Sequence, residues 1–229
     1  MYLWSFLTYG FLGYLLEKVY ALVTRSRHTV RKGYLLLPVC PVYGLAMLAV
    51  LAGDALQPEA FRLIAEAPCM SAESRVEAIR VLSHAAGADG MVAGQVIDTL
   101  CGVSTQQELT GMYRLKTGVM ISAAAELGCV ASGMPAAMRQ QAIAFADKLG
   151  LAFQIRDDML DVVGDEAVFG KPIGSDREEG KVTFVDVLGL EGCRTAVEEC
   201  TRRAEEAILP WPDHDFLLTL AHSLEERKK

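Results

Sequence analysis

The sequence predicts an all-α protein, and two observations support that class. From Gly53 onward, apolar residues recur with helical spacing, whereas the alternation of β-branched residues that is typical of strands is rare. Small residues are also frequent there, as expected where helices pack closely together. These small residues include Ala124, Ala125, Gly128, Ala142, Ala144 and Ala146. We therefore expect a bundle of helices after residue 53.

The composition excludes several function classes. The 229 residues are 52% apolar and 22% charged, which is typical of a globular core. The net charge is −7 and there is no basic, aromatic-rich patch, so nucleic acid is not an expected partner. The six cysteines are scattered without a CxxC motif, which is typical of apolar cysteines in a reducing compartment. The four histidines lack metal-ligand spacing, so we expect no zinc site.

The chain divides into two unlike parts. Residues 1–53 contain no aspartate and a single glutamate, Glu17, whereas acidic residues are common from Asp54 onward. We therefore predict a hydrophobic, membrane-like segment over residues 1–45. A second, helical domain is predicted over residues 46–229.

Residues 2–24 are expected to form a transmembrane helix. The stretch exceeds the roughly 20 residues that a bilayer span requires. Trp4 and the tyrosines near its ends suit the membrane interface. The stretch lacks the basic N-terminal region and the small-residue cleavage site of a signal peptide. Glu17 and Lys18 would mark a helix contact or a polar site. The alternative is an amphipathic core helix of a soluble protein.

The loop that follows indicates an orientation. Four basic residues lie within residues 25–32, which predicts a cytoplasmic loop. The next apolar stretch, residues 34–53, is interrupted early by Pro38, Pro41 and Gly44. A second span would place the rest of the chain on the far side of the membrane. A single span leaves that part in the cytoplasm, which suits the chemistry described below.

The segments "FLTYGFLGYLLEKVY" and "RKGYLLLPVCPVYG" resemble the opening of a bacterial integral membrane family named for ABC-transporter type IV. The resemblance covers only residues of about 4–46. It implies a membrane location and says almost nothing about activity.

Helix signals define the second part. Ser71 is a plausible N-cap for a helix ending at Gly87. A further helix starts at Ser104 or Thr105 and extends to about residue 133. Pro135 suits the first turn of the helix that runs to about residue 164. Two shorter helices and a C-terminal helix follow.

One helix carries an acidic face. In "FQIRDDMLDVVGD", residues 153–165, carboxylates at 157, 161 and 165 share one face. Such like-charged pairs destabilise a helix by roughly 0.2–0.5 kcal/mol each. Mg²⁺ would offset this repulsion, because it is held by one or two carboxylates together with substrate phosphates. The alternative is a solvated helix face, the commoner explanation of an isolated DDxxD.

Two other motifs indicate phosphate. "RLKTG" places Lys116 and Thr117 on a helix, where both can donate to an anion. "GKPIGSDREEGKVT" places Lys171 and Lys181 in a glycine-rich segment, where backbone and ammonium groups can approach an oxyanion. Each motif alone is ordinary, and Gln154 alone could be a buried polar group. Their occurrence together and in this order favours a diphosphate site.

A second resemblance rests on "GMVAGQVID", "RLKTGVMISAAAELG", "GLAFQIRDDMLDVVGD" and "FGKPIGSDREEGKVTFVDVLGLE". These segments resemble the C-terminal half of a trans-isoprenyl diphosphate synthase of the polyprenyl synthetase family, farnesyl/geranylgeranyl type, over residues of about 46–229. The resemblance implies an incomplete isoprenoid-synthase-type helical bundle. It also implies condensation of an allylic diphosphate with isopentenyl diphosphate.

The resemblance also implies residue roles. The second aspartate-rich motif, which binds Mg²⁺, comprises Asp157, Asp158 and Asp161, with Asp157 as the most direct ligand. The substrate-binding residues are Lys116, Thr117, Gln154, Lys171 and Lys181. The catalytic residues are Lys116, Lys181 and Asp157. Gln95 and Asp98 match the GGQxxD helix of the family. They would contact the substrate-binding and metal-binding side chains rather than the substrate itself.

The family's first aspartate-rich motif is missing, because no aspartate precedes Asp54. The basic residues that would bind isopentenyl diphosphate are missing with it. We therefore expect this chain to be impaired as an enzyme by itself. We also expect an exposed apolar face on the helical domain, which residues 1–50, a second copy or an intact synthase would cover. The alternatives are a non-catalytic, membrane-tethered diphosphate-binding subunit and a gene-fusion fragment without selected function.

Overall fold

The computed structural model describes residue 8, residues 41–163 and residues 181–225. Within these ranges every regular element is a helix, which confirms the predicted class. None of the helices described there is both long enough and apolar enough for a bilayer span. The predicted transmembrane segment, residues 2–24, lies outside these ranges apart from Thr8 and therefore stays a prediction.

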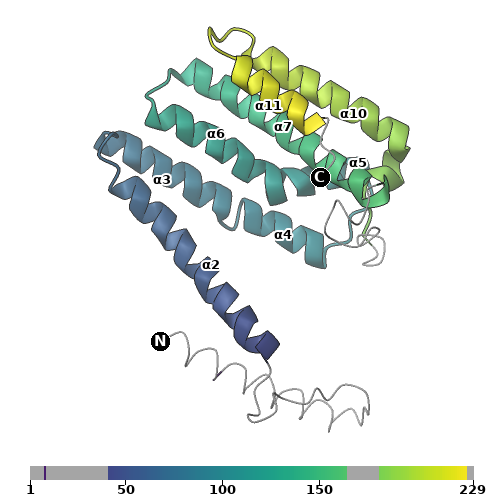
Figure 1. Ribbon diagram of the computed structural model, residues 1–229, viewed down its shortest axis with the longest axis horizontal. Helices are drawn as coiled ribbons and strands as arrows, with labels where there is room; N and C mark the ends of the chain where they lie inside the picture. Colours follow the sequence, from purple (N-terminus) through teal and green to yellow (C-terminus); the bar gives the residue numbers. More distant parts are fainter. Residues whose placement is uncertain (1–7, 9–40, 164–180, 226–229) are drawn as a thin grey trace. The chain divides into compact units, whose positions relative to one another are not determined.

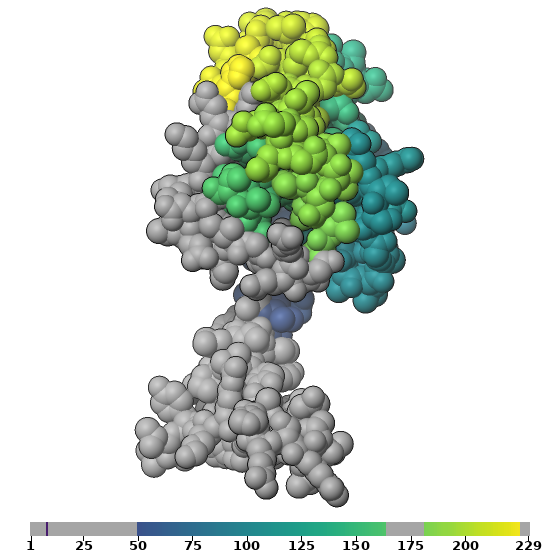
Figure 2. Space-filling model, turned by 90° about the vertical axis from the view of Figure 1, so that its right-hand side faces the viewer, coloured from purple at the N-terminus to yellow at the C-terminus, as the bar shows by residue number. Residues whose placement is uncertain are grey.

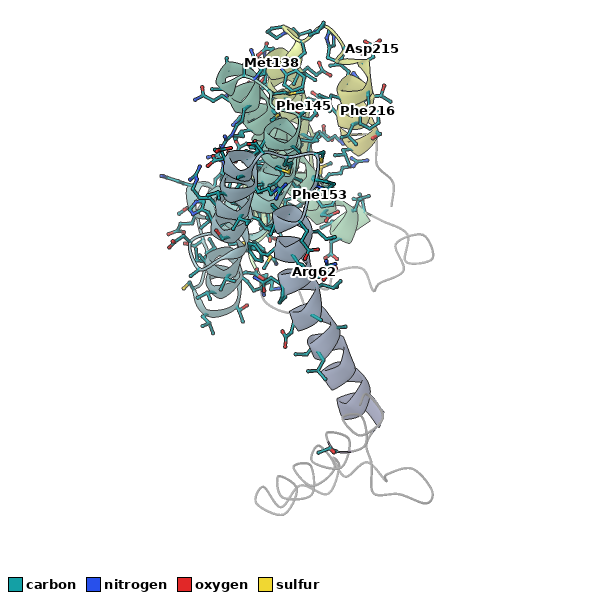
Figure 3. The ribbon with its side chains drawn as sticks, turned by 90° about the vertical axis from the view of Figure 1, so that its left-hand side faces the viewer. Arg62, Met138, Phe145, Phe153, Asp215 and Phe216 are labelled. Atoms are coloured by element: carbon teal, nitrogen blue, oxygen red, sulfur yellow. The ribbon has the colours of Figure 1, made fainter. Side chains whose placement is uncertain are left out.

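The chain divides into two compact units, Met1–Glu66 and Ala67–Lys229. In the first unit, helix α2 (Pro41–Ala65) runs through the predicted domain boundary between residues 45 and 46. Arg62, marked in Figure 3, pairs with Glu59 and Glu66 at i,i+3 and i,i+4 spacing on its exposed surface. Exposed pairs of this kind contribute little to stability, because solvent screens the charges.

The second unit contains the remaining described helices. Helices α6, α7 and α10 lie side by side, and α3 continues the row next to α6 (Figure 1). α11 packs against α7 and α10, and α10 covers much of the face shown in Figure 2. The elements are α3 (Ala72–Ala86), α4 (Met91–Leu100), α5 (Gln106–Tyr113), the π-helix η1 (Arg114–Gly118), α6 (Val119–Ala131), α7 (Ala136–Val163), α10 (Phe184–Ile208) and α11 (Asp215–Glu225).

The predicted helix starts are confirmed where caps are described. Ser71 accepts a hydrogen bond from the Ser74 amide at 3.1 Å, and α3 ends at Gly87. Thr105, rather than Ser104, caps α5 in a capping box with Glu108. In a capping box the two side chains reciprocally satisfy amide groups that the first helical turn leaves unpaired.

The predicted helix from residue 104 to about 133 is confirmed as a helical run over residues 106–131, but this run is not α-helical throughout. The structure has α5, then one turn of π-helix at Arg114–Gly118, then α6. A π-turn accommodates one extra residue and is frequently found at functional sites. The two shorter helices predicted towards residue 209 are confirmed, because Gly189 (φ 68°) kinks α10. A φ in this range favours glycine, which has no Cβ to clash.

The core of the second unit consists of two main clusters. The larger cluster joins α5, α7 and α10, and its fully buried members include Leu109, Ile155 and Phe184. The smaller cluster joins α7, α10 and α11 around Phe145, whereas Phe216 on α11 is 76% exposed (Figure 3). The described cysteines are free, and those on α6 and α10 are buried, as expected for apolar cysteines.

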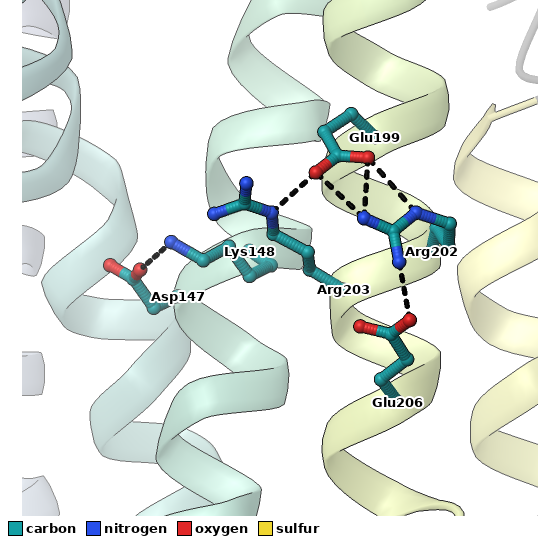
Figure 4. A network of polar contacts seen from close by, with 6 residues as sticks. All are labelled: Asp147, Lys148, Glu199, Arg202, Arg203 and Glu206. Atoms are coloured by element: carbon teal, nitrogen blue, oxygen red, sulfur yellow. Dashed lines mark hydrogen bonds and ion pairs between the residues drawn. The ribbon is translucent and has the colours of Figure 1, made fainter.

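The surfaces of α7 and α10 carry ion pairs (Figure 4). On α10, Glu199 accepts hydrogen bonds from Arg202 and Arg203, and on α7 Lys148 pairs with Asp147 at 3.1 Å. These side chains are largely exposed or half-buried, so solvent screens the pairs and each contributes little to stability.

A less exposed ion-pair network ties three helices together. Arg139 on α7 pairs with Glu126 on α6, with 2.8 Å from Nε to Oε1, and with Glu77 on α3. Glu77 also accepts from Arg80 at 2.8 Å. Hydrogen bonds from Arg80 and then Arg139 lower the pKa of Glu77 from 4.5 to about 2. The carboxylate of Glu77 is therefore more stable in the folded state than in the unfolded state.

This pKa shift predicts acid sensitivity of the fold. Because the folded pKa lies below the unfolded value, the Glu77 carboxylate stabilises the protein above pH 4.5, and this contribution is lost as the pH falls towards about 2. We expect Glu77→Gln to reduce the pH dependence of the unfolding free energy in this window, measured by urea denaturation followed by circular dichroism. Glu191→Gln, at a residue with an 83% exposed side chain, is the control. An unchanged pH dependence in Glu77→Gln would contradict the assignment.

Candidate functional site

The candidate site is built where α4 and α7 pack against the π-helix η1. A Cβ at Gly94 on α4 would lie 2.1 Å from the Lys116 amide nitrogen, so only glycine allows this approach. A Cβ at Gly150 on α7 would lie 3.1 Å from the Cα of Gly118. The segment "RLKTG" is therefore held between two helices whose backbones come unusually close to it.

This packing brings two lysines to one carboxylate. Asp98 lies one turn after Gly94 on α4, and its side chain is 8% exposed. Lys116 Nζ donates to Asp98 Oδ2 at 2.8 Å, and Lys181 Nζ lies 3.6 Å from the same oxygen. Lys116 comes from η1 and Lys181 from the chain just before α10, so residues distant in sequence converge here.

The convergence borders a small polar cavity of about 110 Å³. Its charged lining consists of the two lysines and three carboxylates, and its remaining lining includes Gln154 and Thr183. The charged residues are Asp98, Lys116, Asp157, Asp158 and Lys181. Because carboxylates outnumber ammonium groups, a diphosphate is expected to bind there only together with a cation that neutralises the acidic wall.

The three predicted aspartate ligands occupy different environments. Asp157 is half-buried and lines the cavity. Asp158 is 4% exposed and accepts hydrogen bonds from Tyr113 Oη and from the Phe184 amide, each at 2.7 Å. Asp161 is 3% exposed. Asp157 is therefore the carboxylate of this stretch best suited to meet a ligand.

The described residues also test whether this site suits Mg²⁺. No group of three or more His, Cys, Asp or Glu side chains that could enclose a metal occurs in the described ranges. Mg²⁺ is commonly held by one or two carboxylates together with substrate phosphates. Asp157 beside the two lysines meets that requirement, so the residues present fit a Mg²⁺ ion that is shared with a bound diphosphate.

The remaining predicted residues lie around this cavity or outside the described ranges. Gln95 lines a neighbouring cavity of about 450 Å³, which also borders Asp98 and Lys181, and its side chain donates to Thr99 at 3.1 Å. Thr117 lies within η1, next to Lys116, and is half-buried. Lys171 lies in residues 164–180, which the structure does not describe.

Two polar residues that line this cavity were not predicted. Tyr113 lines the cavity and donates to Asp158, and Thr183 caps α10 in a capping box with Asp186. The spacing T-x-x-D at residues 183–186 could have indicated the cap, because it resembles the capping-box pattern. No sequence signal places Tyr113 next to an aspartate 45 residues away.

The fold and the site define a class: an all-helical protein with a lysine- and carboxylate-lined cavity suited to a diphosphate. Comparison with known proteins specifies the class further. The family model described as Polyprenyl synthetase matches residues 29–208, and the chain belongs to this family. The match begins upstream of residue 46, where the sequence alone placed the start of the family domain.

Among curated relatives, a farnesyl diphosphate synthase from Haemophilus influenzae is 33% identical over 203 residues, covering 87% of this chain and 68% of that protein. One from Geobacillus stearothermophilus is 42% identical over 161 residues, covering 67% of this chain and 52% of that protein. The chain thus spans about half to two thirds of the length of these relatives.

A solved structure with a similar fold is that of a geranyltransferase from Helicobacter pylori, described as complexed with magnesium and isoprenyl diphosphate. Its sequence is 32% identical, and the TM-score is 0.65 over 78% of this chain and 59% of that one. The resemblance of residues of about 4–46 to the ABC-transporter type IV family stays a prediction.

Proposed function

We propose that this chain binds an allylic prenyl diphosphate together with Mg²⁺ in the cavity between α4, η1, α7 and α10. The observation that carries the proposal is the convergence of Lys116 and Lys181 on Asp98, in a cavity that Asp157 also lines. The relatives that are farnesyl diphosphate synthases support a prenyl chain as the organic part of the ligand.

Each group has a distinct task in this proposal. The Lys116 and Lys181 ammonium groups neutralise charge that develops on the diphosphate as it leaves the allylic carbon. Asp157 would hold the Mg²⁺ ion. Bound Mg²⁺ would act as a Lewis acid on the diphosphate oxygens. Asp98 holds the two lysines close to each other before substrate arrives, and Gln95, Thr117, Gln154 and Lys171 complete the proposed surroundings.

We propose that condensation with isopentenyl diphosphate is impaired in this chain by itself. No aspartate precedes Asp54 in this sequence, so the first aspartate-rich motif of the family, which would face Asp157, is not among these residues. The purified chain should turn over geranyl diphosphate and labelled isopentenyl diphosphate far more slowly than an intact synthase in the presence of Mg²⁺.

The turnover assay also separates the alternatives. Addition of a separately expressed N-terminal synthase half should raise turnover if this chain is a competent C-terminal half. Diphosphate binding without any rescue would favour a non-catalytic binding subunit. Neither binding nor rescue would favour a fusion fragment without selected function. Turnover by the chain alone at the rate of an intact synthase would refute the proposed impairment.

A second candidate function is that of a membrane-tethered subunit, favoured by the apolar stretch of residues 2–24. The basic residues within 25–32 would then place the synthase domain in the cytoplasm. Co-sedimentation of the full chain with lipid vesicles, compared with a chain lacking residues 2–24, tests this candidate. Equal sedimentation of both proteins would exclude it.

A further inference from the structure

Asp158 makes contacts that differ from those of a metal ligand. Its Oδ1 accepts from Tyr113 Oη and its Oδ2 accepts from the Phe184 amide, each at 2.7 Å. The carboxylate is 4% exposed, and hydrogen bonds to a buried, charged acceptor are among the stronger ones in proteins. Both oxygens are therefore used to join α7 to α5 and to the start of α10.

The contact with α10 satisfies the start of that helix. Phe184 is the first residue of α10, and its amide has no partner within the helix. Thr183 and Asp186 satisfy neighbouring polar groups through the capping box. Asp158 supplies the acceptor for Phe184 and places a negative charge at the positive end of the α10 dipole.

The contact with α5 is supported by an aromatic pair. The rings of Tyr113 and Phe184 lie 5.6 Å apart between centroids, and these residues are 8% and 1% exposed. Replacing the tyrosine by phenylalanine would keep this ring contact and remove only the hydroxyl group. The chain therefore offers a variant that isolates the hydrogen bond to Asp158.

The three joined residues are each close in sequence to a proposed ligand group. Tyr113 lies three residues before Lys116, Phe184 lies three residues after Lys181, and Asp158 follows Asp157 directly. The link among the three therefore joins the segments that carry the two ammonium groups and the Asp157 carboxylate.

We propose that Asp158 is a positioning residue: together with Tyr113 and the Phe184 amide, it sets the spacing of Lys116, Lys181 and Asp157 and does not itself bind Mg²⁺. The inference rests on the proposed diphosphate-binding function. It assigns different tasks to two adjacent aspartates of one motif.

The test uses the full chain and isothermal titration with geranyl diphosphate. Asp158→Asn and Tyr113→Phe should each weaken geranyl diphosphate binding by about tenfold. At saturating geranyl diphosphate, the Mg²⁺ concentration for half-saturation should change by less than about twofold in both variants. The double variant should bind no more weakly than Asp158→Asn, because the two residues act as one unit. Asp157→Asn should instead raise the Mg²⁺ requirement, and Asp213→Asn, at an exposed loop residue, is the charge-matched control.

A rise in the Mg²⁺ requirement in Asp158→Asn but not in Tyr113→Phe would overturn the proposal, as would additive losses in the double variant. If the unmodified chain binds no geranyl diphosphate, the proposed function fails. Amide hydrogen exchange then still tests the link among Asp158, Tyr113 and the Phe184 amide. In that experiment the Phe184 amide should exchange at least about tenfold faster in Tyr113→Phe than in the unmodified chain. Unchanged exchange would overturn the proposed link.

Discussion

Replacing Lys116 or Lys181 by alanine should weaken the binding of inorganic pyrophosphate in the presence of Mg²⁺ by roughly ten- to a hundredfold. This magnitude corresponds to the loss of a charge-assisted hydrogen bond of about 1.5–3 kcal/mol. Both ammonium groups lie within 3.6 Å of Asp98 Oδ2 beside the same cavity, so both should contact one diphosphate. Isothermal titration measures the effect.

Lys148→Ala is the matched control for these variants. Lys148 lies on α7 and pairs with the neighbouring Asp147 at the surface (Figure 4), so its loss removes one positive charge without touching the cavity. Thermal unfolding should be followed in parallel, because either substitution removes a partner from the largely buried Asp98. Pyrophosphate affinity that falls equally in Lys148→Ala would mean that net charge, rather than the cavity, determines binding.

Gly94→Ala should destabilise the fold by about 1–3 kcal/mol and weaken pyrophosphate binding at the same time. The new Cβ would lie 2.1 Å from the Lys116 amide nitrogen. Because this nitrogen belongs to the backbone, no change of side-chain rotamer can remove the clash, so α4 and η1 must separate. Separation moves Asp98 away from Lys116, because Asp98 lies one turn further along α4. Urea denaturation and pyrophosphate titration measure the two effects.

Gly111→Ala provides the control for the same chemical change. Gly111 lies within α5, and a Cβ there would meet nothing within 4 Å. Alanine at this helical position should stabilise the protein by about 0.4–1 kcal/mol. Equal stability of Gly94→Ala and Gly111→Ala would contradict the close contact between α4 and η1.

The sequence predicted those parts of the fold that depend on local signals. The starts of α3 and α5 were predicted from Ser71 and Thr105, because a capping side chain acts within a few residues. The long α7 followed from its apolar period. Local patterns did not reveal the π-turn at Arg114–Gly118, because it forms where the backbones of Gly94 and Gly150 press against that segment.

The site was predicted in part for the same reason. The motifs indicated Lys116, Lys181 and Asp157 as groups of one diphosphate site, and these three residues line one cavity. The family resemblance already made Asp157 the most direct Mg²⁺ ligand, but the motif did not show what Asp158 contacts, since adjacent residues on a helix differ by about 100° in direction and meet different neighbours. Only the packing of α5 and α10 against α7 shows that Asp158 meets Tyr113 and Phe184.

The most direct test of the central claim is isothermal titration of the full chain with geranyl diphosphate, with and without Mg²⁺, for the unmodified protein and for Asp157→Asn. We predict saturable binding of one ligand per site that requires Mg²⁺. In Asp157→Asn the Mg²⁺ concentration needed for binding should rise, with the helical circular dichroism of both proteins unchanged. Absence of binding in the unmodified chain, or equal Mg²⁺-dependent binding in Asp157→Asn, would contradict a prenyl diphosphate site at this cavity.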